Sequence, residues 1–429
     1  MLIDRIKSGT GLIAGLDIGT SKVCVVVGEI LKDGISIVSL SSVPSYGVKK
    51  GVINDAEAAA SSIRKAISSA EKLVGKAIDE VYTGISGTHI KSVVSMGSSS
   101  ITGNNITDQD IDRALESAVN TNSYQDMEII QILPSDFLID RQGGISNPIG
   151  MSGDVLEVEA QIFVSDKSSL ENLILCCEIA EVKIADIIIQ ALASAEASLT
   201  PQERENGAAV IDIGGGITEI AIYKHNLLKQ AIILGIGGNH FTNDLSIVLG
   251  IPFQEAERIK INNGYIMTEA PEGGNGIDTL TADGNSKKLH QKDISEILSA
   301  RSQELLELIR KEIKHSVSLH SSLTGVILSG GACLLPGFRE MAEEILTIPV
   351  RIAYPELVSK KFNKNIDFEG QHNILHSVVP EFNQPIYTAG IGLVMYGAGH
   401  QHISEKTTTH HLSSSGITNK MAEWFKNIR

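Results

Sequence analysis

The chain contains two stretches that look like copies of each other, Gly15-Leu16-Asp17-Ile18-Gly19-Thr20-Ser21-Lys22 and Val210-Ile211-Asp212-Ile213-Gly214-Gly215-Gly216-Ile217-Thr218-Glu219. Each follows a short apolar run and leads into another, which is the pattern of two buried strands joined by a tight turn. The same unit of strand, acidic turn and strand therefore occurs once in each half of the chain.

Such a turn suits a nucleotide phosphate. Glycines let the backbone approach an anion closely and aim N–H donors at it, and hydroxyls can add further donors. An Asp at the end of each first strand can hold Mg²⁺, directly or through its waters. Two facing turns would enclose one triphosphate from both sides. The candidate residues are Asp17, Gly19, Thr20, Ser21, Lys22, Asp212, Gly214, Gly215, Gly216 and Thr218.

The alternative is structural, because a single Asp-x-Gly turn is most often only a hairpin. A second copy in the other half of the chain favours the phosphate interpretation. Neither stretch is a P-loop or a dinucleotide fingerprint, since the required glycine and lysine spacings do not occur.

Composition limits the class of protein. A length of 429 residues with 42% hydrophobic content predicts a soluble protein of about two to four domains. The formal net charge of −15 argues against nucleic-acid binding by the bulk surface. The sequence has no signal-peptide pattern and no apolar run of about 18 residues, so it is expected to be neither secreted nor membrane-spanning. Four scattered cysteines predict buried, reduced thiols: Cys24, Cys176, Cys177 and Cys333.

Strand and helix patterns alternate along the chain, which is typical of an α/β sheet. Residues 83–164 differ: a capping-box signal at Thr107 and Asp110 precedes a helix, and two alternating strands follow, which predicts a small inserted subdomain. A second helix carries Glu257 and Lys260, whose carboxylate and ammonium could meet a ribose and a base. An ordinary surface ion pair is the competing interpretation. Further along, an apolar strand ends in Gly330 and Gly331, a candidate shelf for a base.

The last residues, 416–429, predict an amphipathic helix. Ile417, Met421, Trp424, Phe425 and Ile428 share an arc of about 100°. Basic residues flank this arc on an otherwise acidic chain, which favours docking on an anionic membrane over packing on the protein's own core. One copy should bind weakly, so attachment is expected to depend on self-assembly. The flanking basic residues are Lys420, Lys426 and Arg429.

Residues 400–415 have the polar composition of a flexible linker. Its histidines could bind metal, but solvated linker side chains are the favoured interpretation. Residues 360–382 match no pattern that assigns them a role.

Together, the two Asp-Gly hairpins, the connecting Gln190-Ala-Leu-Ala-Ser, the Glu-x-x-Lys and the late Ser-Gly-Gly resemble the actin, Hsp70 and sugar-kinase superfamily. Within it the chain resembles the FtsA family of bacterial actin-like cell-division proteins from Gly11 to Arg429. The specific parts are Val81-Tyr-Thr-Gly-Ile-Ser-Gly-Thr-His-Ile, the segment from Ile132-Leu-Pro-Ser-Asp-Phe to Asn147-Pro-Ile-Gly-Met, and the tail.

The resemblance implies a duplicated actin/Hsp70-like (RNase H-like) α/β fold with an inserted small α+β subdomain and a C-terminal amphipathic helix. In this frame, residues 1–82 and 165–200 form the first subdomain (1A), and residues 83–164 form the insert (1C). Residues 201–240 and 322–399 form the second actin-like subdomain (2A), and residues 241–321 form its outer subdomain (2B).

The resemblance also implies an ATP site at the two turns, Glu257, Lys260, Gly330 and Gly331. Asp212 would hold Mg²⁺ and a water, and Gln190 falls where actin places a water-orienting Gln. FtsA proteins are poor ATPases, so ATP is expected to act mainly as a polymerisation ligand. Arg301 and Glu304 match the family's site for the FtsZ C-terminal peptide, although they could equally be a solvated pair.

The expected function is that of a self-assembling protein that docks on the cytoplasmic face of the inner membrane at the septum. There it would link the FtsZ ring to the membrane, and its insert would contact later division proteins. Two alternatives use the same fold: a sugar kinase, which leaves the tail unexplained, and a scaffold of a pilus machine, which would not bind an FtsZ peptide. An Hsp70-like chaperone is disfavoured, since no substrate domain follows.

Overall fold

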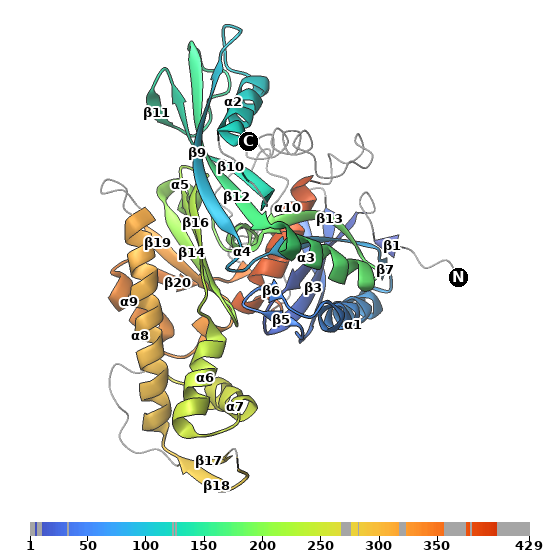
Figure 1. Ribbon diagram of the computed structural model, residues 1–429, viewed down its shortest axis with the longest axis vertical. Coiled ribbons are helices and arrows are strands. Elements are labelled where there is room, and N and C mark those ends of the chain that lie inside the picture. The colour runs from blue at the N-terminus through green and yellow to red at the C-terminus, as the bar shows by residue number, and fades with distance from the viewer. Residues whose placement is uncertain are drawn as a thin grey trace.

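The computed structural model of the protein describes residues 5–6, 11–31, 34–121, 124, 127–266, 276–281, 283–316, 323–355, 375–377 and 380–400 (Figure 1). The predicted tail at 416–429, the linker after His400 and most of residues 360–382 lie outside this part of the chain. Short paired strands accompany the main sheets: β1 (Arg5–Ile6) with β7 (Ala77–Ile78), and β5 (Val48–Lys49) with β6 (Val52–Ile53).

The first half is a mixed sheet with the strand order β13-β8-β2-β3-β4-β21. The first predicted turn joins β2 to β3, and β2, β3 and β4 are antiparallel, whereas β8 and β13 run parallel to β2. Helix α1 covers one face of this sheet together with α3. The bounds are β2 (Leu12–Ile18), β3 (Lys22–Leu31), β4 (Gly34–Pro44), β8 (Glu80–Ile85), β13 (Lys183–Ile189), β21 (Leu375–Ser377), α1 (Ala56–Val74) and α3 (Lys167–Ile179).

The second half repeats the pattern with the order β16-β15-β14-β19-β20. The second turn joins the antiparallel strands β14 and β15, and β19 and β20 continue parallel to β14. The bounds are β14 (Ala208–Ile213), β15 (Thr218–Lys224), β16 (Leu227–Leu234), β19 (Gly325–Ser329), β20 (Val350–Ile352) and α9 (Phe338–Leu346). This duplication of strand, turn and strand confirms the predicted two-half α/β architecture.

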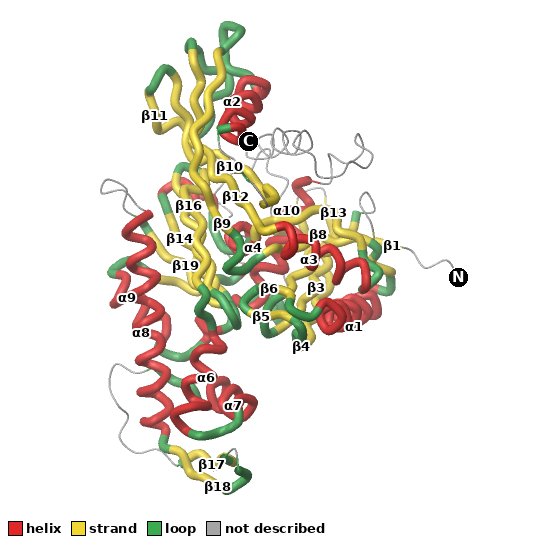
Figure 2. Tube along the Cα trace, in the orientation of Figure 1, coloured by secondary structure: helices red, strands yellow, loops and turns green. Residues whose placement is uncertain are grey.

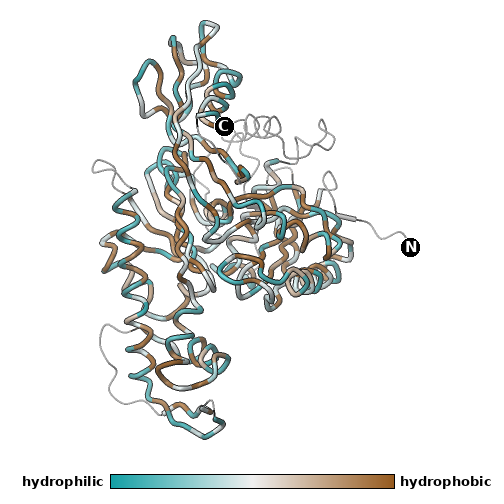
Figure 3. The backbone as a smooth tube through the Cα atoms, viewed as in Figure 1, coloured by the Kyte–Doolittle hydropathy of each residue, from teal (hydrophilic) through white to brown (hydrophobic). Residues whose placement is uncertain are grey.

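Helices and a small hairpin form the outer part of the second half, which hangs from one end of the molecule (Figures 1 and 2). They are α6 (Gly238–Leu249), α7 (Phe253–Asn263), α8 (Gln291–Ser316), β17 (Ile277–Leu280) and β18 (Ser286–Leu289). Hydrophobic residues run along the central strands of both sheets, and the long α8 alternates between hydrophobic and hydrophilic segments (Figure 3).

The insert is a separate layer of sheet and helix. It has the strand order β11-β10-β12-β9, and α2 packs against β9 and β12 around a hydrophobic core of its own. The capping box of Thr107 and Asp110 is present at the start of α2. Strand β8 of the first sheet continues to Ile85, so the insert begins after that residue and not at residue 83. The bounds are β9 (Lys91–Ser100), α2 (Asp108–Asn120), β10 (Met127–Ile139), β11 (Gln142–Ile145) and β12 (Val155–Asp166).

The last described helix, α10 (Thr388–His400), packs on the first sheet, and only its first residue, Thr388, is seen to hydrogen-bond Ser329 at the end of β19. Ile391 and Val394 share a buried cluster with Ile13 and Val26, on the face opposite α1. The boundary predicted from sequence placed residues 322–399 in the second half. The chain instead crosses back, because the apolar face of the first sheet opposite α1 is buried only when α10 covers it.

Although the insert leaves the first half, it rests on the second. Gln161 Nε2 on β12 donates to the Lys229 carbonyl oxygen on β16 at 3.0 Å, and Lys229 Nζ lies 3.8 Å from Asp136 Oδ1 on β10. Leu227, at the start of β16, is part of the insert's hydrophobic core. The insert therefore contacts both halves of the molecule.

An ion pair joins the segment that connects the two halves to the second sheet. Glu203 in α5 (Pro201–Asn206) accepts two hydrogen bonds from Arg351 on β20, Nε to Oε1 at 2.7 Å and Nη2 to Oε2 at 2.6 Å. Burial alone would raise the pKa of Glu203, but Arg351 and the backbone of Thr200 lower it below its ordinary value. The ionised pair is therefore a stabilising contact.

We expect Glu203→Gln to lower the free energy of unfolding by about 1–2 kcal/mol, at the low end for charged hydrogen bonds because water reaches the pair. The loss should shrink as the pH falls, since a lowered pKa stabilises only where the unfolded carboxyl is ionised. Urea unfolding at pH 7.5 and pH 4 measures both effects. Glu340→Gln, which removes a surface pair with Arg339, is the control, and equal stability of the two variants would contradict the expectation.

Candidate functional site

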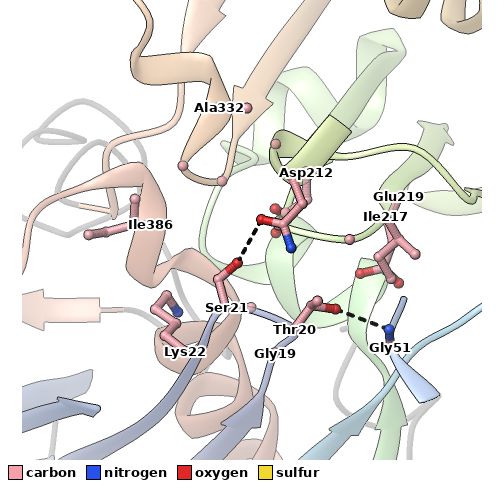
Figure 4. A pocket seen from close by; sticks show the side chains of 18 of the residues that line it. Gly19, Thr20, Ser21, Lys22, Gly51, Asp212, Ile217, Glu219, Ala332 and Ile386 are labelled. Atoms are coloured by element: carbon pink, nitrogen blue, oxygen red, sulfur yellow. Dashed lines mark hydrogen bonds between the residues drawn. The ribbon is translucent and has the colours of Figure 1, made fainter. Parts of the chain in front are cut away.

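The two glycine turns of the sequence meet at a cavity of about 430 Å³ between the halves (Figure 4). They are in direct contact: a Cβ added to Gly215 would lie 1.9 Å from Ser21 Oγ, and one added to Gly216 would lie 2.6 Å from Thr20 Oγ1. A side chain at either position would therefore push against the hydroxyl group of the facing turn, so glycine favours this close approach. The residues from the two turns that line the cavity are Asp17, Gly19, Thr20, Ser21, Lys22, Asp212, Gly214, Gly215 and Gly216.

Asp17 in the first turn is only 3% exposed, and both of its carboxylate oxygens accept hydrogen bonds. Its Oδ2 accepts from Lys22 Nζ at 2.9 Å, and its Oδ1 accepts from Gln190 Nε2 at 3.0 Å. Burial opposes the charge of Lys22, but the Asp17 carboxylate more than compensates and raises the pKa of the ammonium. Gln190 thus lines the cavity as predicted, with its amide nitrogen held by Asp17.

Asp212 in the second turn accepts a hydrogen bond from Ser194. Burial, together with the nearby Asp17, raises the pKa of Asp212 to about 6. Glu219 lies directly opposite Asp212 in the antiparallel pair of β14 and β15, and burial and Asp212 raise its pKa to about 8. Two carboxyl groups therefore share one buried face at the cavity.

Sequence reasoning missed Glu219. A Glu in the strand after a turn reads as a solvent-facing residue of a half-buried strand. One signal in the sequence could have found it. The residues that alternate with Glu219 on the same face of the strand, Ile217, Ala221 and Tyr223, are not charged, so this face is not a solvent-facing one.

Thr218 corrects a prediction. Its hydroxyl donates to the Ile236 carbonyl oxygen at 2.8 Å, its side chain is fully buried, and it is not among the cavity residues. The direction of the side chain explains this: successive residues of a strand point to opposite faces, and Glu219 takes the cavity face. Thr218 therefore braces the turn and supplies no hydroxyl to the cavity.

Glu257 and Lys260 on α7 line the cavity and also form an ion pair, with Nζ 2.7 Å from Oε2. Lys260 donates in addition to Thr242 Oγ1 at 2.8 Å and to the Gly238 carbonyl oxygen at 3.1 Å. Burial lowers the pKa of Lys260, which Glu257 partly offsets. The two residues therefore form an ion pair, and this pair lies partly buried at the wall of the cavity.

Gly330 and Gly331 follow β19 at the carboxyl end of the sheet and line the cavity. Gly330 has φ +83°, and a Cβ there would lie 2.4 Å from the Ile213 carbonyl oxygen, so only glycine fits. Next to them, Leu334, Leu335 and Pro336 give the cavity an apolar wall. Glycine backbone beside an apolar wall suits a flat aromatic base.

No three His, Cys, Asp or Glu side chains converge closely enough to hold a metal ion directly among the described residues. Asp17 and Asp212 nevertheless face one cavity from the two turns. This arrangement fits Mg²⁺, which keeps most of its waters and takes one or two carboxylates. The four cysteines are buried and unpaired, as expected.

Arg301 and Glu304 lie away from the cavity on α8. Arg301 Nε is 2.5 Å from Asp244 Oδ2 on α6, its Nη1 contacts Glu304, and its side chain is 23% exposed. The guanidinium is therefore held between two carboxylates at the surface of the outer helices.

The comparisons with known proteins agree with this architecture. A family model described as "Cell division protein FtsA" matches residues 209–392, and one described as "SHS2 domain inserted in FTSA" matches residues 87–164. The chain is 34% identical over 394 residues to cell division protein FtsA of Pseudomonas aeruginosa, covering 91% of this chain and 90% of that protein. The chain belongs to the FtsA family.

Other relatives extend the match. FtsA of Bacillus subtilis is 32% identical and covers 91% of this chain and 84% of its own length. FtsA of Escherichia coli K12 is 28% identical over 97% of this chain and 96% of its own length. The family membership makes the chain an actin-like cell-division protein.

Among solved structures, the PilM-PilN type IV pilus biogenesis complex aligns with a TM-score of 0.63 at 14% identity, over 90% of this chain and 98% of that one. MreB5 of Spiroplasma citri bound to ADP aligns with a TM-score of 0.54 at 15% identity, over 93% and 99%. At these identities the likeness shows the actin-like fold alone. Within the described residues, no helix is both long and apolar enough to cross a membrane.

Proposed function

We propose that this FtsA-family chain binds ATP with Mg²⁺ in the cavity between its halves and assembles into an actin-like polymer. The observation that carries the proposal is the meeting of two glycine turns, each bearing an Asp, at one cavity of about 430 Å³. A volume of this size lies in the range of small-molecule sites. Backbone N–H groups of both turns would bind the phosphates, and Asp17 and Asp212 would hold Mg²⁺ through its waters.

The remaining cavity residues fit the rest of the nucleotide. Glu257 would accept hydrogen bonds from ribose hydroxyls beside Lys260, and Gly330 and Gly331 would pack against adenine. Gln190 would orient a water for slow hydrolysis, which leaves ATP mainly as a ligand that favours polymerisation. Slow hydrolysis of this kind needs no dedicated catalytic base.

We further propose that Arg301 and Glu304 take part in binding the FtsZ C-terminal peptide. Arg301 already lies between the carboxylates of Asp244 and Glu304. A peptide carboxylate could bind this guanidinium only by displacing Asp244 or Glu304. The insert would contact neighbouring subunits and later division proteins.

The tail at 416–429 would attach the polymer to anionic lipids on the cytoplasmic face of the inner membrane at the septum. The support is its sequence, in which five apolar residues share one arc and basic residues flank it. Each copy would bind weakly, and polymerisation would multiply the attachment. Loss of the tail should therefore remove membrane binding and leave nucleotide binding intact.

Liposome co-sedimentation with ATP tests this expectation. We expect the full chain to sediment with anionic vesicles, and both a chain cut before Gly416 and the variant Trp424→Glu to remain at least tenfold more in the supernatant. Trp424→Phe is the matched control and should bind nearly as well as the parent chain. Equal sedimentation of all four would contradict the membrane attachment, and a fluorescent ATP analogue measures nucleotide binding in parallel.

A further inference from the structure

Glu219 is a second buried carboxyl group on the face of the sheet that borders the cavity. It pairs directly with Asp212 across β14 and β15, so both side chains leave the sheet on the same side. It is only 3% exposed and lines the cavity, where Figure 4 places it next to Ile217 and the Asp212 turn. No role in the sequence pattern or in the proposed ATP site accounts for it.

One oxygen of this carboxyl group is unsatisfied. Glu219 Oε1 and Ser86 Oγ line the same cavity, and both are buried without a well-formed hydrogen bond to another described residue, although the Ser86 hydroxyl lies near enough to favour the ionised carboxylate. Buried polar atoms of native proteins almost always have partners, either protein or ordered water. Two orphaned oxygens beside one cavity therefore indicate a position for a water molecule, which needs two to four polar partners.

The other polar side chains of this corner are already engaged. Both oxygens of Asp17 accept hydrogen bonds, from Lys22 and from Gln190. The amide nitrogen of Gln190 is therefore hydrogen-bonded to Asp17, whereas Glu219 Oε1 can still accept a hydrogen bond. Since no direct cage of ligands exists in the described part of the chain, a cation here must be held largely through its waters.

We propose that Glu219 is a positioning residue of the nucleotide site, whose carboxyl group and the Ser86 hydroxyl hold one of the waters that surround the divalent cation beside Asp212. This inference rests on the proposed binding of Mg²⁺ and ATP. This water of the cation differs from the attacking water that we propose for Gln190. Outer groups of this kind typically change metal affinity by 10–100-fold when removed.

The test is the Mg²⁺ dependence of nucleotide binding, measured with a fluorescent ATP analogue titrated with MgCl₂. Glu219→Gln keeps the size of the side chain and replaces the carboxyl group, whether protonated or ionised, by an amide. We expect the Mg²⁺ concentration at half-maximal binding to rise about tenfold, while affinity for the analogue in EDTA stays unchanged. Glu219→Asp should shift it less. If Glu219 served only in packing, its replacement would not change the Mg²⁺ midpoint while leaving the affinity in EDTA unchanged.

Two comparisons make the outcome decisive. Glu205→Gln, outside the cavity on α5, should leave the Mg²⁺ midpoint unchanged. The proposal is overturned if folded Glu219→Gln matches the parent chain, or if Gln190→Ala alone produces the tenfold shift. If the parent chain binds no nucleotide at all, the proposed ATP site fails and this inference fails with it. Far-UV circular dichroism confirms that each variant is folded.

Discussion

Asp212→Asn is expected to weaken Mg²⁺-dependent ATP binding by roughly 100-fold, which is about 2.7 kcal/mol. Asn has the same shape but no charge, so the phosphate turn keeps its geometry and loses its metal-directed carboxylate. Binding of the analogue in EDTA should change little. Isothermal titration calorimetry with and without Mg²⁺ measures both quantities.

The same substitution should stabilise the empty protein. Burial raises the pKa of Asp212 to about 6, so its ionised form is less stable in the folded chain than in the unfolded one, by about 1–3 kcal/mol. The parent chain should lose stability relative to Asp212→Asn as the pH rises from about 4 to about 6, because the unfolded carboxyl ionises first. Above that range the difference should stay constant.

Asp293→Asn, an exposed position at the start of α8, controls for removal of one negative charge. It should change neither the nucleotide affinity nor the pH profile of stability. If Asp212→Asn bound Mg²⁺·ATP as tightly as the parent chain, Asp212 would not face the metal. A stability profile that is parallel for all three proteins would contradict the buried, uncompensated charge.

Gly392→Ala is expected to lower the free energy of unfolding by about 3–5 kcal/mol, although alanine is the better helix former. Gly392 lies where α10 crosses α4 (Gln190–Glu196), and a Cβ there would be 1.7 Å from the Ala193 carbonyl oxygen. That obstacle is helix backbone, so the two helices must separate. Urea unfolding followed by circular dichroism measures the loss.

Gly390→Ala on the same helix is the matched control. Its added Cβ would meet the Val26 Cγ2 methyl group at 2.7 Å, the end of a side chain that can shift. We therefore expect a much smaller loss than at Gly392. If the two variants were equally stable, α10 and α4 could separate without loss. The close packing of these helices behind Gln190 would then not contribute to the free energy of unfolding.

The sequence was sufficient for the parts of the site that lie on tight turns. Asp17 and Asp212 end apolar strands and precede glycines, so their positions follow from local patterns alone, and the structure brings them to one cavity. The helix after Thr107 was equally local, because its capping box satisfies its own backbone. Such features need no knowledge of distant contacts.

Features that depend on tertiary packing were missed. Helix α10 is apolar on nearly all sides, so no polar face indicated which sheet it would cover. Thr218 and Glu219 are adjacent, and only the register of β14 with β15 decides which of them faces the cavity. The role of the tail at 416–429 stays a prediction, since those residues lie outside the described part of the chain.

The contact of the insert with β16 has a mechanical consequence. The chain enters the insert from β8 of the first half, yet Gln161 and Asp136 hold Lys229 of the second half. The insert thus bridges the two halves of the molecule. A rotation that widened the cavity would have to tilt the insert or break its contacts with Lys229, so the orientation of the insert is coupled to the opening of the cleft.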